Sequence, residues 1–235
     1  MGYWIESSYV KHPKTMARLN RRKRFRTVTM RELVTTMNHL QVHDFCRAYS
    51  KATLLLHIAT TDYATARCAM INGLAGGFGV GAQAIEKYLK AMILLADYSA
   101  NIRGMKHYLV RLLAEAERCI PELSSHNLLP VAQRFTQYYQ ARYPDNPNQP
   151  SGMDTRELHE LDRFVMAIYA HLPCPRNVKF RTGLYASITF SLNENSPNAT
   201  PTEHWIKKNN VAIFEIWPDI VSQYPMVMQE LHPRV

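Results

Sequence analysis

The chain has 235 residues, 46% hydrophobic and 20% charged, a balance typical of a globular protein with a buried core. No apolar run approaches the roughly 18 residues of a membrane-spanning helix, and no secretory signal is recognisable at the N-terminus. The cysteines stand far apart without a C-x-x-C pair, which argues against a zinc framework or a dense disulfide scaffold. They are Cys46, Cys68, Cys119 and Cys174. We therefore expect a cytoplasmic protein with free, mostly buried thiols, no metal and no cofactor.

The net charge of +9 comes from one segment near the N-terminus. Nine of the 28 basic residues lie between Lys11 and Arg31 with no acidic residue among them, and the other 19 equal the 19 acidic residues. We expect residues 1–29 to form a flexible basic arm. Such an arm can contact nucleic acid, because each neutralised phosphate releases counterions. The alternatives are an inert disordered tail and an extension upstream of a start at Met30. The nucleic-acid candidates in the arm are Arg21, Arg22, Lys23, Arg24 and Arg26.

Apolar residues recur at helical spacing from Met30 to Pro175. The pattern predicts two helices over 31–49 and 54–71, followed by a turn that contains five of the nine glycines. Four further helices are predicted over 84–99, 109–120, 128–143 and 154–172. Prolines end the last three of these helices, and Asp154 with Glu157 predicts a capped start of the last one. Glu86 and Lys90 are expected to form an i,i+4 pair on the outer face of their helix.

Successive amphipathic helices with short loops and no strand between them predict an all-α fold. We expect an up-and-down antiparallel bundle of about five helices over residues 30–175. Residues 176–235 differ, because apolar residues at mostly even spacing between Phe180 and Leu192 predict a strand. We expect this last segment to be a small mixed appendage packed on the bundle.

The glycine turn contains the sequence Gly77-Phe-Gly79-Val-Gly81-Ala82, which fits a loose dinucleotide-binding pattern. Its context does not fit that function, because no buried strand precedes it and no βαβ unit follows. We interpret the glycines as an interhelical turn that allows two helices to approach closely.

Four short motifs occur in an order that resembles the HEPN family of prokaryotic nucleotide- and RNA-linked systems. They are Asp62–Arg67, the E-K-x-L-K-A stretch from Glu86 to Ala91, Lys106-His107-Tyr-Leu, and Ala141-Arg142-Tyr143-Pro144. The resemblance covers residues 55–175 and implies a helical bundle, a homodimer and a nucleotidyltransferase partner. It points to four candidate contacts for a nucleotide or phosphate, which are Lys87, Lys90, His107 and Arg142. Each of these also has a structural alternative, as an exposed helix charge, a cap or an ion pair.

Many members of that family are metal-independent RNases with an R-x(4–6)-H motif, and this chain has no such pair. Arg163 and His171 have seven residues between them, so on one helix their side chains diverge by about 80°. We therefore predict no catalytic residue. The expected function is a non-catalytic binding module for a nucleotide, a nucleic acid or a nucleotidyltransferase partner. The alternative is a divergent metal-independent RNase, or a toxin of a toxin–antitoxin-like system.

Overall fold

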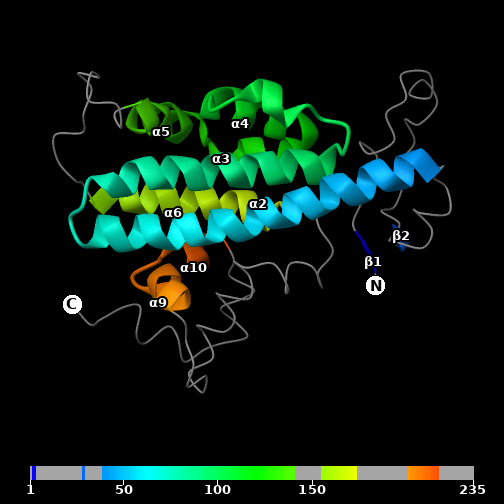
Figure 1. Cartoon of the computed structure of the whole chain (residues 1–235). Helices are drawn as coiled ribbons and strands as arrows, with labels where there is room; N and C mark the ends of the chain where they lie inside the picture. Colours follow the sequence, from blue (N-terminus) through cyan, green and yellow to red (C-terminus); the bar gives the residue numbers. More distant parts are fainter. Residues whose placement is uncertain (1, 4–27, 30–38, 141–154, 174–200, 217–235) are drawn as a thin grey trace, which may run out of the picture.

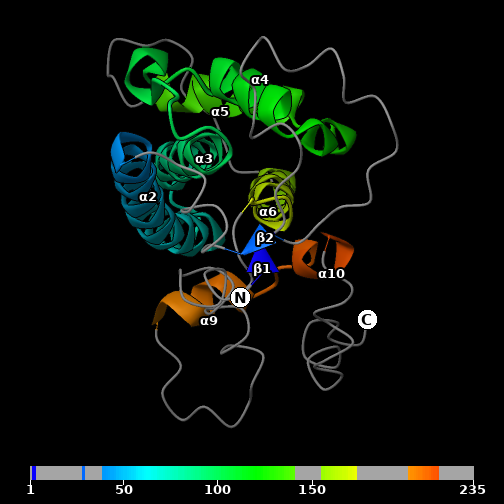
Figure 2. The same cartoon turned by 90° about the vertical axis from the view of Figure 1, so that its right-hand side faces the viewer.

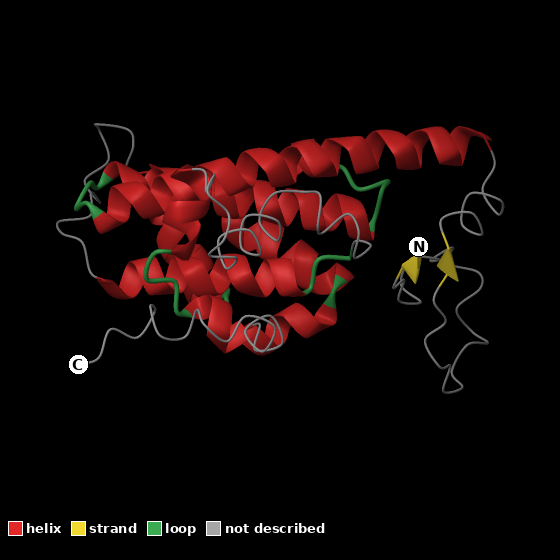
Figure 3. Cartoon of the chain, turned by 90° about the horizontal axis from the view of Figure 1, so that it is seen from below, coloured by secondary structure: helices red, strands yellow, loops and turns green. Residues whose placement is uncertain are grey.

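The computed structural model describes residues 2–3, 28–29, 39–140, 155–173 and 201–216 (Figure 1). Helices dominate these ranges, and the predicted all-α bundle is confirmed (Figure 3). Five of the helices have eleven residues or more. They are α2 (His39–Ile71), α3 (Gly76–Ala96), α4 (Leu109–Cys119), α5 (Leu129–Gln140) and α6 (Thr155–Ala170). Two 3-10 helices, η3 (Ile102–Met105) and η4 (Pro121–His126), flank α4.

Helix α3 lies at the centre of the bundle and packs against α2, α4, α5 and α6 (Figure 2). Its predicted apolar stripe is buried, and so are the stripes predicted on α4 and α6, except that Leu158 at the start of α6 is half-buried. Because neighbours surround α3, the expected outer position of Glu86 is wrong, and its side chain is only 9% exposed. The predicted pairing with Lys90 is nevertheless present, with 2.6 Å between Lys90 Nζ and Glu86 Oε1.

Helix α2 is one continuous helix, so the prediction of two separate segments over 31–49 and 54–71 is wrong. The stretch from His39 to Ile71 contains neither glycine nor proline, and nothing in it interrupts the backbone hydrogen bonds. One buried stripe also runs through the expected break at helical spacing. Its members are Ala48, Ala52, Leu56, Ala59 and Tyr63. Residues 30–38 lie outside the described ranges.

A turn between α2 and α3 is present as predicted, but it is shorter than expected and contains only Gly73 of the five glycines. The other four, Gly76, Gly77, Gly79 and Gly81, lie in the first turns of α3, which begins before the predicted start at residue 84. Gly73 adopts a φ of +77°, which glycine tolerates better than other residues. Gly77 allows the helices to approach, because a Cβ at this position would lie 2.7 Å from Met70 Cγ and 3.0 Å from the Ala66 carbonyl oxygen. Absence of a side chain therefore sets the distance between α2 and α3 near the turn.

Gly77→Ala is expected to lower the free energy of unfolding by about 1–3 kcal/mol, because the added methyl overpacks a backbone contact. Gly76→Ala is the matched control, since a Cβ at Gly76 would meet nothing within 4 Å. Urea unfolding of both variants measures the difference. Equal stability of the two variants would contradict the close-approach role of Gly77.

The described part of the C-terminal appendage is helical and consists of α9 (Pro201–Lys207) and α10 (Ala212–Ile216). Helix α9 packs on α2, and α10 packs on α6 (Figure 2). The strand expected between Phe180 and Leu192 lies outside the described residues. In the predicted basic arm, β1 (Gly2–Tyr3) pairs antiparallel with β2 (Val28–Thr29), and the other arm residues are likewise not described.

A buried polar network attaches α9 to the bundle. Arg67 on α2 is fully buried and donates from Nε and Nη2 to the two Asp162 carboxylate oxygens on α6, at 2.8 and 3.0 Å. The same guanidinium donates to the carbonyl oxygens of Trp205, Ile206 and Lys208 at the end of α9. The carbonyls of the last turn of a helix have no partner inside it, so Arg67 caps the C-terminus of α9. Asn210 Nδ2 also donates to the Ile206 carbonyl oxygen, at 3.0 Å.

Tyr63 and Asn210 complete this network. The Tyr63 hydroxyl donates to Asp162 Oδ1 at 2.6 Å, and Asn210 Nδ2 donates to the Tyr63 oxygen at 2.8 Å. Burial raises the pKa of the Asp162 carboxyl, but the charge and hydrogen bonds of Arg67 oppose that shift. Burial also lowers the pKa of Arg67, but the Asp162 charge, Tyr63 and the hydrogen bond to Asp162 together outweigh this effect and raise that pKa. With three donors on Asp162, we treat the pair as ionised.

The described cysteines are free, with Cys46 exposed, Cys68 half-buried and Cys119 buried. The expectation of mostly buried thiols is therefore wrong for Cys46, because it lies on the exposed side of α2. None of the helices in the described ranges combines the length and apolar character needed to cross a membrane.

Candidate functional site

The predicted phosphate contacts that the structure describes each have a carboxylate partner. Lys87 on α3 forms an ion pair with Asp62 on α2. Lys90 and His107 both contact Glu86, and His107 Nδ1 lies 2.8 Å from Glu86 Oε2. Arg142 and the arm candidates Arg21, Arg22, Lys23, Arg24 and Arg26 lie outside the described residues.

The Glu86 contacts connect three parts of the bundle. His107 precedes α4, and its ring stacks on Tyr139 of α5 with 5.1 Å between centroids and an interplanar angle of 18°. Since a carboxylate only accepts hydrogen bonds, His107 donates from Nδ1 to Glu86. The motif positions Glu86, Lys90 and His107 therefore hold α3, the start of α4 and α5 together, which favours their structural interpretation.

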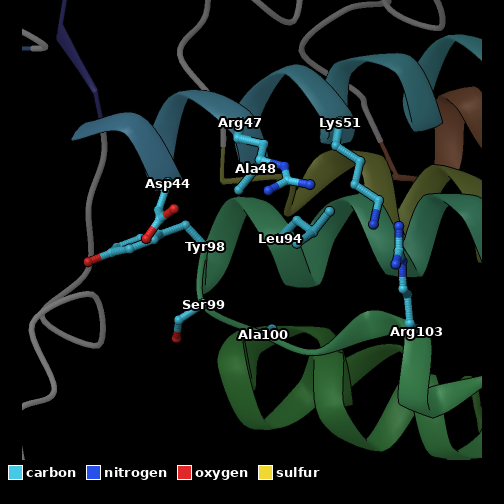
Figure 4. Close-up of a pocket in the computed structure, with 9 residues that line it drawn as sticks. All are labelled: Asp44, Arg47, Ala48, Lys51, Leu94, Tyr98, Ser99, Ala100 and Arg103. Atoms are coloured by element: carbon cyan, nitrogen blue, oxygen red, sulfur yellow. The ribbon is translucent and has the colours of Figure 1, made fainter. Parts of the chain in front are cut away.

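A pocket of about 460 Å³ lies between α2, the C-terminal end of α3 and η3 (Figure 4). The side chains of Arg47 and Lys51 reach it from α2, and Arg103 reaches it from η3. We call it the basic pocket. Its other lining residues are Asp44, Ala48, Leu94, Tyr98, Ser99 and Ala100. The volume falls in the range of small-ligand sites, which is roughly 300–1,000 Å³.

The three cations of the basic pocket repel one another. Among the described residues, no carboxylate lies within ion-pair distance of Arg47, Lys51 or Arg103. Partial burial, followed by the positive charges of Arg103, Lys90 and Arg47, lowers the pKa of the Lys51 amine. An anion bound between Lys51 and Arg103 would relieve this repulsion, so the arrangement is suited to phosphate or a similar anion.

The sequence motifs did not identify the basic pocket, because its cations come from positions far apart in the chain. A signal was nevertheless present in α2, where Asp44, Arg47 and Lys51 have the i, i+3, i+7 spacing of one helix face. Because the sequence predicts a break between residues 49 and 54, Lys51 is expected outside a helix. The three residues are then not expected to share one helix face. Arg103 carries no comparable signal, since its position depends on how η3 folds back towards α2.

A second polar cluster joins η4 to the end of α6. His126 Nε2 and His171 Nε2 are 2.8 Å apart, so one ring donates the shared proton and the other accepts it as a neutral imidazole. Arg163 Nε lies 3.5 Å from Glu215 Oε2 on α10. Arg163 and His171 thus have different partners, as their spacing on α6 predicts.

Protonation of this histidine pair is expected to destabilise the fold. Burial, followed by the charge of Arg163, lowers the pKa of His126 in the folded protein. Unfolded His126 takes up its proton first, so stability is complete above about pH 6.5 and falls as the pH drops below that value. Urea midpoints at about pH 7.5 and about pH 5 measure the loss. His126→Gln should show a smaller loss between the two conditions, and an undiminished loss would contradict the assignment to His126.

The described residues contain no group of three His, Cys, Asp or Glu side chains that could hold a metal ion. No family model, curated protein or solved structure matches this chain. The HEPN resemblance therefore stays a prediction from the sequence motifs.

Proposed function

We propose that this chain is a non-catalytic binding module that holds phosphate groups of a nucleotide or nucleic acid in the basic pocket. The proposal rests on one observation. Arg47, Lys51 and Arg103 line the same pocket, and none of them has a carboxylate partner in the described structure. Cations that serve the fold have such partners elsewhere in the molecule, as Arg67 and Lys87 do.

The two kinds of cation in the pocket have complementary uses. The arginines present planar forks of N–H donors that match two phosphate oxygens, whereas Lys51 supplies a compact charge. A bound phosphate also supplies the negative charge that would offset the repulsion around Lys51. The basic arm predicted at residues 1–29 would add contacts to a longer strand that do not depend on sequence.

Arg103→Ala is expected to weaken the binding of a labelled single-stranded RNA of roughly 12 nucleotides about tenfold, equivalent to about 1.4 kcal/mol. Fluorescence anisotropy at fixed salt measures the affinity. Arg111→Ala, which removes an exposed arginine on α4, is the control with the same change in net charge. Equal losses in the two variants would show non-specific attraction and contradict the proposal.

The alternative is a metal-independent RNase or toxin, and the His126–His171 pair is the observation that favours it. Two histidines can supply a general acid and a general base for phosphodiester cleavage. Incubation with mixed RNA in the presence of a chelator distinguishes the two functions. Cleavage that His171→Ala abolishes would replace the binding-module proposal, whereas intact RNA would support it.

The predicted homodimer and nucleotidyltransferase partner rest on the sequence resemblance alone. Sedimentation of the full chain at several concentrations tests the first prediction. A monomer throughout the concentration range would contradict the dimer.

A further inference from the structure

The basic pocket has two chemically different ends (Figure 4). At one end the side chains of Lys51 and Arg103 point towards each other. At the other end lie Tyr98, Asp44 and Ser99, with Arg47 between the two ends. A ligand that fills the pocket therefore meets positive charge at one end, and an aromatic ring beside a carboxylate at the other.

The Tyr98 ring is held by aromatic neighbours on α2. The rings of Phe45 and Tyr98 pack edge to face, with 6.2 Å between centroids and 78° between planes, and Phe45 in turn stacks on Tyr49 at 6.0 Å. Such packing fixes the orientation of a ring before a ligand binds. An aromatic side chain that lines a cationic pocket is a suitable surface for a nucleobase to stack on.

Asp44 supplies two acceptor oxygens beside this ring. Its carboxylate is 68% exposed, and His43 Nδ1 at 3.8 Å is its ion-pair contact in the described structure. An ionised carboxylate accepts hydrogen bonds but donates none, and it can accept two parallel N–H groups. Among the common nucleobases, guanine offers two adjacent donors of this kind on its N1 and N2 atoms.

The spacing of Asp44 and Lys51 along α2 fits a single nucleotide. Asp44 and Lys51 are seven residues apart on one face of α2, so their Cα atoms are about 10.5 Å apart along the helix axis. This separation is comparable to that between the phosphate and the far edge of the base in a purine nucleotide.

We infer that the basic pocket binds one guanine nucleotide, free or within a strand, with the phosphate at Lys51 and Arg103 and the base on Tyr98. Asp44 accepts hydrogen bonds from guanine N1 and N2 and determines base preference. This inference rests on the proposed function and names the ligand class of the same site. Adenine presents one amino donor next to an unprotonated ring nitrogen, so a carboxylate pairs with it less well.

Calorimetric titration of the full chain with GMP, IMP, AMP and inorganic pyrophosphate tests the inference. IMP lacks only the N2 amino group of GMP, and pyrophosphate has no base. We expect GMP to bind about tenfold more tightly than IMP or AMP, because one bidentate pair typically separates bases by that factor or more. Asp44→Asn should remove this preference. Tyr98→Leu should weaken GMP binding about tenfold and leave pyrophosphate binding unchanged.

The outcomes separate the inference from the proposed function. Equal affinities for GMP, IMP and AMP that all fall in Arg103→Ala would overturn the guanine assignment and retain the phosphate site. A GMP affinity unchanged by Tyr98→Leu would also overturn it. No binding of any nucleotide or of pyrophosphate would overturn the proposed function itself. Because Asp44 is exposed, Asp44→Asn tests base preference without disturbing the fold.

Discussion

Arg67→Ala is expected to lower the free energy of unfolding by about 3–5 kcal/mol, the typical effect of removing one partner of a buried ion pair. Asp162 would stay buried with only Tyr63 as a hydrogen-bond donor. The carbonyl groups at the end of α9 would also lose their cap. Hydrogen exchange should therefore rise in α9 more than in α4, to which Arg67 donates no hydrogen bond.

Urea unfolding measures the stability loss, with Arg111→Ala as the control for removal of an exposed arginine. The double variant Arg67→Leu/Asp162→Leu should lose less stability than the sum of its single variants, because the second change removes the stranded charge. A loss in Arg67→Ala no larger than in the control would contradict the ionised network.

Glu86→Ala is expected to lower the free energy of unfolding by about 2–4 kcal/mol. The substitution leaves the partly buried Lys90 without its carboxylate and removes the acceptor of His107. The contacts between α3, the start of α4 and α5 would weaken together. The loss should appear in the urea midpoint of the variant and should not depend on added nucleotide.

Glu115→Ala provides the matched control, because it breaks the exposed ion pair with Arg118. It should lower the free energy of unfolding by at most about 1 kcal/mol. If Glu86→Ala were no less stable than this control and lost nucleotide binding, Glu86, Lys90 and His107 would have to be assigned to a ligand site. The structural interpretation of these motif residues would then be wrong.

The helices could be predicted from the sequence because burial repeats at helical spacing. Ile85, Leu89 and Met92 lie on the predicted stripe of α3 and are fully buried. The close approach of α2 and α3 was equally predictable, since Gly77 has no side chain where the two helices must approach. These features depend on residues close to one another in the chain, so the local pattern contains the information.

The polar contacts between helices could not be predicted, because they join residues far apart in sequence. Arg67 and Asp162 are separated by 95 positions, and Tyr63 and Asn210 by 147. Nothing in the sequence around any of these four residues indicates its distant partner. The basic pocket could not be predicted for the same reason, because Arg103 comes close to Lys51 only in the folded bundle. Glu86 was placed on the outer face because the sequence does not show how many neighbours surround α3.

The salt dependence of RNA binding tests the phosphate-binding role of the basic pocket most directly. We expect Lys51→Ala/Arg103→Ala to lower the slope of log K against log salt by about 1.4, or about 0.7 for each lost phosphate contact on a single strand. The comparison variant replaces five arm residues with glutamine in the full chain, and these are Arg21, Arg22, Lys23, Arg24 and Arg26. A pocket variant with unchanged slope and affinity, beside an arm variant that no longer binds, would contradict this role of the pocket and assign the phosphate contacts to the arm.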